Sequence, residues 1–438
     1  MEAIRVAEIA RVEGHGGVEV RLAGDRVTEV NFEIFEGSRF FERLLLGRSY
    51  QEITGLVCRV CAICSAGHTV TSLMAIEDAL GLVVSEQTRL LRELMFLGQM
   101  IESHALHLFC LALPDYLGYG GVLPLAKDRP AEVALGLALK KLGNDLQAAV
   151  GGRAIHPVNA VVGGFGRVPE APELAALAER LDAALAQAPA VLKLLAALRV
   201  PDHAVSPSTF VALDPGEGFG FFGKTAVTSN GHRFDVHDYR RLTNERVVGH
   251  SHAKHSQLDG EPYMVGSLAR LHHWFDRLTP LAQDAAREIG LCLPSENCLH
   301  NNHAQAVELI WSLERAASVI RTLLRAGLGE EPSAPVAWPG PCRGVAATEV
   351  PRGTLYHAYS FDGAGRLTEV DIVTPTAQNL ANVEKDLRAC AEGLAGRPDT
   401  ELVPALEMVV RAYDPCISCS VHVIRPDAAG VPAQSRRT

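Results

Sequence analysis

Two pairs of cysteines stand at opposite ends of the chain. Cys61 and Cys64 form the first pair, Cys416 and Cys419 form the second, and each pair has the spacing C-x-x-C. This spacing lets two sulfurs face one ion, and four thiolates make the soft ligand set that suits zinc, iron–sulfur and other thiophilic metals. If the pairs share a metal, two segments with 351 residues between them must meet in one place.

The long separation between the pairs bears on the kind of metal site. A structural zinc site is the commonest use of paired C-x-x-C motifs. Zinc ribbons, however, usually join their two pairs by a short loop of about 15–20 residues. A metal that joins both ends of a large domain through its core fits a buried catalytic centre better than a local zinc staple.

Composition excludes several other classes of protein. The formal net charge is −10 over 438 residues, which argues against a nucleic-acid-binding surface. The first residues lack the charged and apolar regions of a signal peptide, and no run of about 18 apolar residues predicts a membrane span. We therefore expect a soluble, cytoplasmic protein. In such a chain, the ten cysteines are expected as thiols or metal ligands rather than disulfides.

Hydrophobic periodicity predicts a mainly helical, α+β fold. Apolar residues recur at helical spacing over 85–113, which predicts one long helix. Strand-like alternation predicts a β-hairpin in the first 35 residues and further strands in 208–239 and 344–373. We expect one large helical domain with a long central helix bundle and small peripheral hairpins and sheets. Further helices are predicted over 130–150, 171–199, 267–290 and 303–327, the last two of them central.

Residues 218–225, GFGFFGKT, match the pattern of a phosphate-binding loop. Such a loop needs a helix directly after its Lys-Thr, because the first amides of that helix hold the phosphate. A β-branched run and an Asn-Gly turn follow here instead. No nucleotide site is expected at this loop.

Longer motifs surround both cysteine pairs. Arg39 and Glu42 are followed, after fifteen residues, by Cys58-Arg59-x-Cys-x-x-Cys, and the second pair lies in Asp-Pro-Cys-x-x-Cys-x-x-His, residues 414–422. With these motifs the chain resembles the large, catalytic subunit of the nickel–iron hydrogenases, of the cytosolic multi-subunit type linked to NAD(P) or another soluble carrier. It departs from the family pattern at Phe40, where glycine is usual. Further landmarks of the family occur in order: RVEGH at 11–15, GGRAIHPVN at 151–159, VPRG at 350–353 and TPTAQN at 374–379.

The resemblance implies a nickel–iron centre. All four cysteines would bind nickel, with Cys61 and Cys416 as terminal ligands. Cys64 and Cys419 would also bridge to an iron that carries cyanide and carbon monoxide. The implied activity is the reversible heterolytic cleavage of H2 to protons and electrons. Two alternatives stay open: a zinc-stabilised structural subunit, and a quinone-module subunit like that of complex I.

Matching positions imply roles for residues around the metals. Glu13 would relay protons from the terminal cysteine. Arg352, which follows Pro351, would lie above the open metal position, with Asp414 and Asp115 as the acids around it.

Other matching positions would support the metals from further out. His68 would hydrogen-bond a bridging sulfur and so tune the centre. Pro375 and Thr376 would hold the cyanides of the iron through a backbone N–H and a hydroxyl. The ligands implied for a buried Mg²⁺ beside the centre are Glu42, His422 and the carbonyl of Ile372.

Electrons that leave such a centre need a further carrier. The chain has no other paired-cysteine cluster for an iron–sulfur relay and no dinucleotide-binding fingerprint. The resemblance therefore implies an iron–sulfur small subunit as partner, together with NAD(P)- or other carrier-reducing diaphorase subunits.

The same resemblance divides the chain at His422. Residues 1–422 would form the working domain. Residues 423–438 would be an extension that a maturation protease removes after His422, once nickel-insertion factors have loaded the site. The alternative interpretation of 423–438 is a disordered tail.

Overall fold

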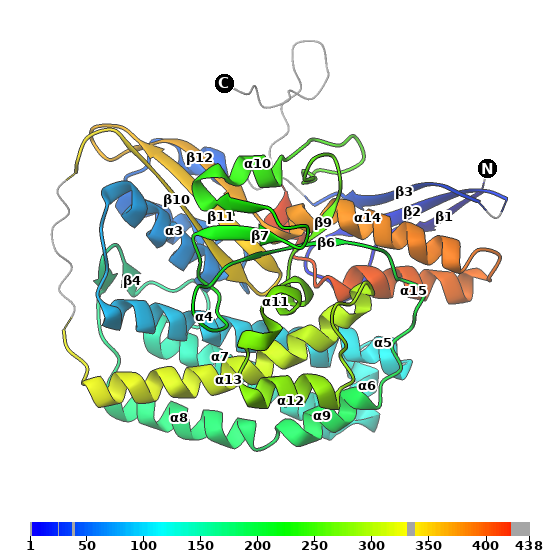
Figure 1. Ribbon diagram of the computed structural model, residues 1–438, viewed down its shortest axis with the longest axis horizontal. Helices are drawn as coiled ribbons and strands as arrows, with labels where there is room; N and C mark the ends of the chain where they lie inside the picture. Colours follow the sequence, from blue (N-terminus) through cyan, green and yellow to red (C-terminus); the bar gives the residue numbers. More distant parts are fainter. Residues whose placement is uncertain (1, 25, 37–39, 331–337, 422–438) are drawn as a thin grey trace, which may run out of the picture.

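Long helices packed against one another form one layer of the molecule (Figure 1). The structure, a computed structural model, describes residues 2–24, 26–36, 40–330 and 338–421. Helix α4 (Glu86–Leu106) packs against both α7 (Pro130–Gly151) and α13 (Asn301–Ala326), and α8 (Ala171–Leu185) packs against α13 and α7. Because α4 and the first half of α13 are buried on nearly all sides, these two helices form the centre of the layer.

The long helix predicted over 85–113 is confirmed. It consists of α4, a π-helical turn (His107–Ala112) and α5 (Leu113–Leu117). By length and composition the stretch Glu86–Leu117 could cross a membrane, but 89% of its most apolar window is buried inside the protein. That burial is the behaviour of a core helix.

Two other predicted helices are each broken in two. Pro189 and Pro280 stand within the first two positions of the second halves, α9 (Ala188–Ala196) and α12 (Pro280–Glu288). Proline fits the start of a helix but cannot continue one, because it lacks the N–H that the preceding turn needs. The periodicity therefore predicted helices in these two segments but missed the breaks.

Two three-stranded antiparallel sheets cover other parts of the molecule (Figure 1). The N-terminal sheet packs against α14 (Pro375–Gly393), and α3 (Ser65–Leu80) packs against β10 and β11. Both sheets confirm the strands predicted in the first 35 residues and in 344–373. Their strands are β1 (Glu2–Val6), β2 (Gly16–Ala23), β3 (Arg26–Ile34), β10 (Cys342–Val350), β11 (Gly353–Phe361) and β12 (Leu367–Val373).

A four-stranded sheet follows the order β8-β7-β6-β9. Strand β7 (Thr225–Thr228) begins inside the GFGFFGKT pattern. A strand therefore stands where a phosphate-binding loop would need a helix, as predicted. The other three strands are β6 (Thr209–Leu213), β8 (Arg233–Asp235) and β9 (Tyr263–Met264).

Shorter elements connect these layers. The described chain also contains α1 (Phe41–Leu45), α2 (Tyr50–Val57), α6 (Val122–Asp128), α10 (Tyr239–Thr243), α11 (Ser267–Trp274), α15 (Asp399–Ala412), α16 (Ile417–Ser420), β4 (Ala160–Val161), β5 (Gly164–Phe165) and 3-10 turns at Val236–Asp238, Phe275–Arg277 and Cys298–His300.

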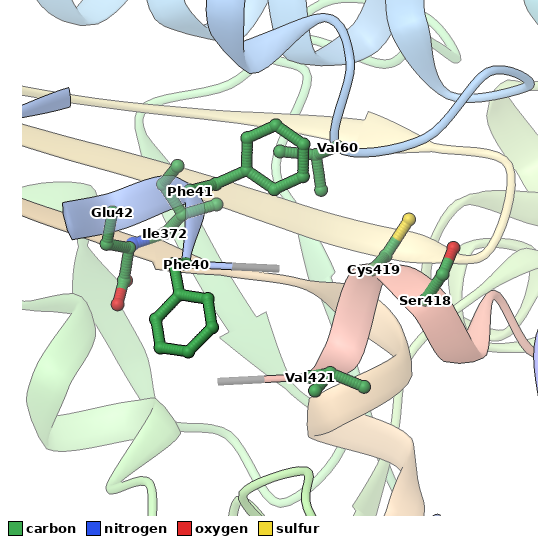
Figure 2. Close-up of a pocket in the computed structure, with 8 residues that line it drawn as sticks. All are labelled: Phe40, Phe41, Glu42, Val60, Ile372, Ser418, Cys419 and Val421. Atoms are coloured by element: carbon green, nitrogen blue, oxygen red, sulfur yellow. The ribbon is translucent and has the colours of Figure 1, made fainter. Parts of the chain in front are cut away.

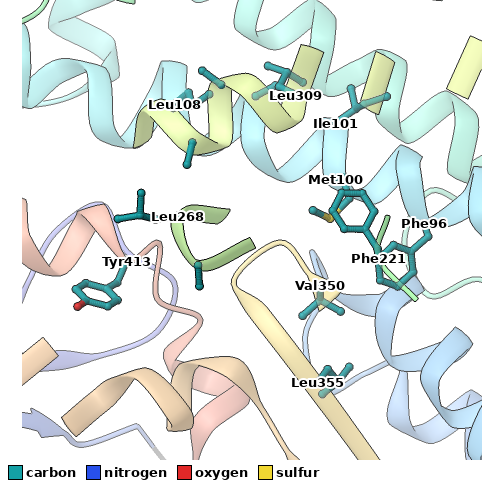
Figure 3. Packing of buried hydrophobic residues seen from close by; sticks show 14 of the residues in the cluster. Phe96, Met100, Ile101, Leu108, Phe221, Leu268, Leu309, Val350, Leu355 and Tyr413 are labelled. Atoms are coloured by element: carbon teal, nitrogen blue, oxygen red, sulfur yellow. The ribbon is translucent and has the colours of Figure 1, made fainter. Parts of the chain in front are cut away.

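The apolar core supports the turn between β10 and β11 (Figure 3). Phe96 of α4 packs on Phe221 with ring centroids 6.0 Å apart, and both belong to the same buried cluster as Val350. Val350 is the last residue of β10. The turn that carries residues 351 and 352 therefore starts from the core and is fixed by it.

Candidate metal centre

The fold brings the two cysteine pairs together in the interior. The Sγ atoms of Cys61, Cys64, Cys416 and Cys419 lie within 4.8 Å of one another, and all four residues are buried. Cys416 Sγ lies 3.2 Å from Cys61 Sγ and is joined to the sulfur of Cys419 as a disulfide, where the sequence predicted thiols or metal ligands. With that pair reduced, the four thiols gathered out of solvent form a ligand set for one soft metal ion or a small metal cluster.

Each pair forms a tight turn beside the start of a helix. Cys64 precedes α3, and its N–H donates to Cys61 Sγ over 3.4 Å. Cys416 precedes α16 in the same way, and the Cys419 N–H donates to the Cys416 carbonyl over 3.1 Å. The positive end of a helix favours a thiolate over a thiol, most clearly for the long helix α3.

The two sulfurs of the first pair differ in acidity. The hydrogen bond with Cys61 and the nearby guanidinium of Arg352 lower the pKa of Cys64. The same hydrogen bond, together with burial, raises the pKa of Cys61 well above its usual value. Cys64 is therefore the more readily ionised sulfur of this pair.

Glu13 reaches the centre from the N-terminal segment. Its backbone forms a parallel β-bridge with Cys416, and its carbonyl accepts from the Ile417 N–H over 2.9 Å. The carboxylate oxygen Oε2 lies 3.3 Å from Cys416 Sγ and accepts from the Ser418 N–H over 3.0 Å, while Oε1 accepts from the Ser418 hydroxyl. Gly14 makes this approach possible, because its φ is +87° and a Cβ there would lie 2.8 Å from Ile417 Cβ.

Arg352 places a buried positive charge beside the sulfurs. Its Nη1 donates to Cys64 Sγ over 3.2 Å, and its Nε donates to the Asp414 carbonyl over 2.6 Å. Its Nη2 forms an ion pair with Asp414 Oδ1 at 3.0 Å, with both side chains only 3% exposed. Burial alone would lower the pKa of Arg352, but Asp414 and Cys64 raise it, so the guanidinium stays charged.

A second buried arginine holds the turn that carries Arg352. Arg270 donates to the carbonyls of Val350 and Pro351 over 3.1 and 3.2 Å. Its charge is balanced by Glu308 at 2.6 Å and Glu349 at 2.9 Å. No sequence motif predicted this group, whose three charged residues are buried inside α11, α13 and β10.

The first turn of α14 borders the second pair. Thr376 Oγ1 accepts from the Cys416 N–H over 3.0 Å, and Pro375 is the first residue of the helix. Of the two residues predicted for this side of the centre, Thr376 therefore contacts Cys416, and Pro375 directly precedes Thr376 in the chain. Asp414, directly before the pair, has φ of +49°, a left-handed conformation that is costly for a residue with a side chain.

A small pocket of about 30 Å³ lies on the Cys419 side of the centre (Figure 2). Glu42 and Ile372 line it together with Cys419, and the Ile372 N–H donates to Glu42 Oε1 over 3.1 Å. Two of the three residues predicted to bind Mg²⁺ therefore line the same pocket, and the Mg²⁺ site itself stays a prediction. His422, the third predicted ligand and the predicted processing site, lies outside the described residues, as do Arg39 and 423–438.

A lysine faces the same group of carboxylates. Lys254 Nζ lies 2.9 Å from Glu245 Oε2. Burial would lower the pKa of Lys254, but the carboxylates of Glu245, Glu42 and Asp371 raise it. The carboxylates around Glu42 therefore favour a positive charge, as a Mg²⁺ site requires. The ammonium group of Lys254 is itself such a charge and would compete with Mg²⁺ for these carboxylates.

His68 lies one helical turn after Cys64. Its N–H donates to the Cys64 carbonyl over 3.0 Å, and its Nδ1 contacts His357 Nε2 at 3.0 Å. Burial lowers the pKa of His68 to about 4, so the imidazole is neutral. Its predicted hydrogen bond to a bridging sulfur stays a prediction.

Asp115 has arginine partners other than Arg352, so its predicted place among the acids around Arg352 stays a prediction. Its carboxylate pairs with Arg411, at 2.7 and 2.9 Å, and with Arg11 rather than with Arg352. Asp115 lies on α5, beyond the π-helical turn, and that turn changes which way later residues of the helix face. Within the described chain, Asp414 is the acid that pairs with Arg352.

Phe40 has a conformation that explains the usual glycine at its position. Its φ of +56° and ψ of 21° lie in the left-handed region, which glycine adopts without strain. The side chain is 54% exposed. The departure from the family pattern therefore costs backbone strain, and Phe40 also lines the pocket beside Cys419.

Comparison with known proteins agrees with this geometry. The profile of the nickel-dependent hydrogenase family matches residues 39–135 and 236–422. Sulfhydrogenase 1 subunit alpha of Pyrococcus furiosus is 40% identical over 432 residues, which cover 96% of this chain and 98% of that protein. NAD-reducing hydrogenase HoxS subunit beta of Cupriavidus necator is 29% identical and covers 95% of this chain and 94% of its own length.

A solved structure shares the fold as well as the sequence pattern. An NAD⁺-reducing nickel–iron hydrogenase in its H2-reduced state matches with a TM-score of 0.86 and 28% identity, over 96% of this chain and 100% of that one. Each of the two ranges matched by the family profile contains one cysteine pair, and the sulfurs of the two pairs meet in the core. The chain therefore belongs to the nickel-dependent hydrogenases and is the large, catalytic subunit of a nickel–iron hydrogenase.

Proposed function

We propose that the four cysteines hold a nickel–iron centre that cleaves H2 reversibly and heterolytically. Cys61 and Cys416 would hold nickel, and Cys64 and Cys419 would hold both nickel and an iron with cyanide and carbon monoxide ligands. The observation that carries this proposal is the approach of four buried sulfurs to within 4.8 Å inside the family's own motifs. When bound, the metals supply a Lewis-acidic, electron-accepting site at which the H–H bond is polarised.

Glu13 is the proton relay of this proposal. Its Oε2 lies 3.3 Å from Cys416 Sγ, close enough to receive a proton from that sulfur. The hydrogen bonds from the Ser418 N–H and hydroxyl hold the carboxylate in this position. A carboxylate on a fixed backbone bridge can take the proton without a large movement of the chain.

Arg352 supplies fixed positive charge next to the reacting site. Its guanidinium is anchored at three places, by the Asp414 carbonyl, the Asp414 carboxylate and Cys64 Sγ. A preoriented buried charge stabilises developing negative charge more than a solvated one does. Pro351, Pro375 and Thr376 complete the wall around the position proposed for the iron's cyanides.

The pocket beside Cys419 is the proposed place of a Mg²⁺ ion. Glu42 would supply a carboxylate oxygen, and the Ile372 carbonyl and His422 would complete the protein ligands. Oxygen-rich sets with one or two carboxylates are typical of Mg²⁺. Lys254, which faces the same carboxylate, would set how tightly the ion is held.

The electrons are proposed to leave through a partner. Among the described residues, the four-cysteine group is the only close gathering of cysteines, so no iron–sulfur relay is found there. The relatives are named as subunits, one of a sulfhydrogenase and one of an NAD-reducing hydrogenase. We therefore propose an iron–sulfur small subunit, diaphorase subunits that reduce NAD(P) or another carrier, and a cytoplasmic location.

The C-terminal extension is proposed to be removed on maturation. The family profile ends at residue 422 and leaves 423–438 unmatched. In this proposal, nickel-insertion factors load the site first and a dedicated protease then cuts after His422. Mass spectrometry of the active enzyme should find a chain that ends at His422, whereas an intact Thr438 in fully active enzyme would overturn this step.

A cysteine substitution tests the catalytic proposal against a structural zinc role. Cys419→Ser removes one bridging ligand and should abolish H2-dependent dye reduction while the chain stays soluble. Cys292→Ser is the matched control, because Cys292 is an exposed, free cysteine and should leave the activity unchanged. Full activity in Cys419→Ser would reject the four-cysteine centre as the site of reaction.

A further inference from the structure

A second group of metal-ligand side chains lies apart from the four cysteines. His250, His255 and Glu384 each offer one ligand atom, and these atoms lie within 4.8 Å of one another. Both histidines come from the loop between α10 and β9, and Glu384 comes from α14. We infer that these three side chains bind a Zn²⁺ ion.

The carboxylate of Glu384 faces both imidazoles. Its Oε1 lies 2.6 Å from His250 Nε2, and its Oε2 lies 3.7 Å from His255 Nδ1. The Phe32 N–H donates to Oε1 over 2.9 Å and so orients the carboxylate from outside the group. Zinc binds nitrogen and oxygen at about 2.0–2.2 Å, so its ligand atoms lie roughly 3.3 Å apart in a tetrahedral site. Small side-chain rotations suffice to reach that spacing.

The environment of His255 is not explained by the ion pair between His250 and Glu384 alone. The residue is only 4% exposed, yet its Nε2 has no hydrogen-bond partner in the described chain, and its Nδ1 lies beyond hydrogen-bond range of Glu384. Buried polar side chains normally have a partner. A metal ion between His255 Nδ1 and Glu384 Oε2, which lie 3.7 Å apart, would give Nδ1 the partner that it lacks in the described chain.

The chemistry of the group selects the kind of ion. Two imidazoles and one carboxylate are the protein ligands of many zinc sites with an open fourth position. The side chains of His250 and Glu384 are 25% and 19% exposed, so the ion can enter from solvent and keep a water ligand. Mg²⁺ and Ca²⁺ are disfavoured, because they prefer oxygen ligands throughout.

The position of the group suggests what the ion does. Ala253, between the two histidines, forms a β-bridge with Val421, and the His252 N–H donates to the Ile34 carbonyl over 2.9 Å. The ion would therefore fasten this loop to α14 and β3. Through the bridge between Ala253 and Val421, it would also hold the segment that follows Cys419. In this role it is a structural clamp behind the four-cysteine centre, and it is independent of the reaction there.

Zinc binding by the assembled enzyme tests the inference. Enzyme with its native metals in the four-cysteine centre is freed of loosely bound ions with a chelator and then titrated with Zn²⁺ against a chromophoric competitor. Wild type should take up about one Zn²⁺ per chain. His255→Phe and His250→Gln should each lower the affinity for Zn²⁺ by about 100-fold or more, because changing a residue that only supports a ligand already costs about 10- to 100-fold. His252→Ala, in the same loop but exposed, should bind as wild type does.

Cobalt distinguishes this group from the cysteines. Co²⁺ bound at two histidines and a carboxylate gives weak visible bands without the strong sulfur-to-metal band of a thiolate site. Equal zinc uptake by wild type and His255→Phe, or a thiolate-type cobalt spectrum, would overturn the inference. If His255→Phe does not fold, as judged by circular dichroism and nickel content, His250→Gln at the partly exposed position decides.

Discussion

Replacement of Arg352 by leucine tests the buried charge pair beside the cysteines. Arg352 and Asp414 are both almost fully buried and pair at 3.0 Å. After the replacement, Gln305 Nε2 at 3.3 Å is the only side-chain hydrogen-bond donor that the described chain leaves to the Asp414 carboxylate. Removing one partner of a buried ion pair costs about 3–5 kcal/mol, because the remaining charge stays out of water. We expect a destabilisation of that size for Arg352→Leu.

A double-mutant cycle separates the pair from its surroundings. Asp414→Asn alone leaves Arg352 without its countercharge, and the double variant Arg352→Leu/Asp414→Asn removes both charges. The double variant should therefore lose less stability than the two single losses added together, by about 2 kcal/mol or more. Guanidinium unfolding of the metal-free chain, followed by circular dichroism, measures this without a contribution from metal release.

Arg352→Lys tests the catalytic part of the same argument. Lysine keeps the charge but cannot contact the Asp414 carbonyl, the Asp414 carboxylate and Cys64 Sγ at once. We expect H2-dependent dye reduction to fall about 100-fold with unchanged nickel and iron content. The loss of one preoriented hydrogen-bond donor typically lowers turnover by about this factor. Additive losses in the cycle, or an Arg352→Lys variant with wild-type turnover, would refute the reasoning.

Three further substitutions test other parts of the account. Glu13→Gln should lower H2 oxidation by about 100-fold or more with unchanged metal content, since it removes the proton acceptor beside Cys416; activity within about twofold of wild type would contradict this. Burial would raise the pKa of Glu308, but its partner Arg270 lowers this pKa to about 2, below the usual 4.5. The ionised Glu308 therefore stabilises the fold above pH 4.5, and this stabilisation is lost as the pH falls towards 2. Glu308→Gln should abolish that pH dependence, worth about 3 kcal/mol, in acid unfolding curves. Gly14→Ala should lower the free energy of unfolding by about 2–5 kcal/mol, because it adds left-handed strain and overlap with Ile417. Gly81→Ala is the control: φ there is +60° but the space is open, so it should cost only about 1–2 kcal/mol. Equal losses in the two variants would show that close packing at Gly14 is unimportant.

Much of the centre could be predicted because its residues are tied to short motifs. The spacing of the two C-x-x-C pairs already required two distant segments to meet, and the sulfurs do lie together. Thr376, Arg352 and Glu13 stand in or beside motifs of fixed length, so their approach to the cysteines followed from the same resemblance. The helices over 85–113 and 303–327 were predictable because their apolar residues recur over many turns.

Other features depend on contacts that no local pattern encodes. The partners of Asp115 are set by a π-helical turn and by Arg411, which is 296 positions away in the chain. The buried group of Arg270 with its two glutamates joins a helix, a second helix and a strand. The left-handed conformation of Phe40 contradicts the preference of its side chain. In each case tertiary packing outweighs what the neighbouring sequence favours.

Metal analysis combined with infrared spectroscopy decides whether the four cysteines hold a nickel–iron centre. The chain is purified after expression with its maturation factors, and its nickel, iron and zinc are counted. The account predicts about one nickel and one iron per chain at the cysteines, with infrared bands in the cyanide and carbonyl region, and their loss in Cys419→Ser. Zinc as the only metal at the four cysteines, with no such bands, would contradict it.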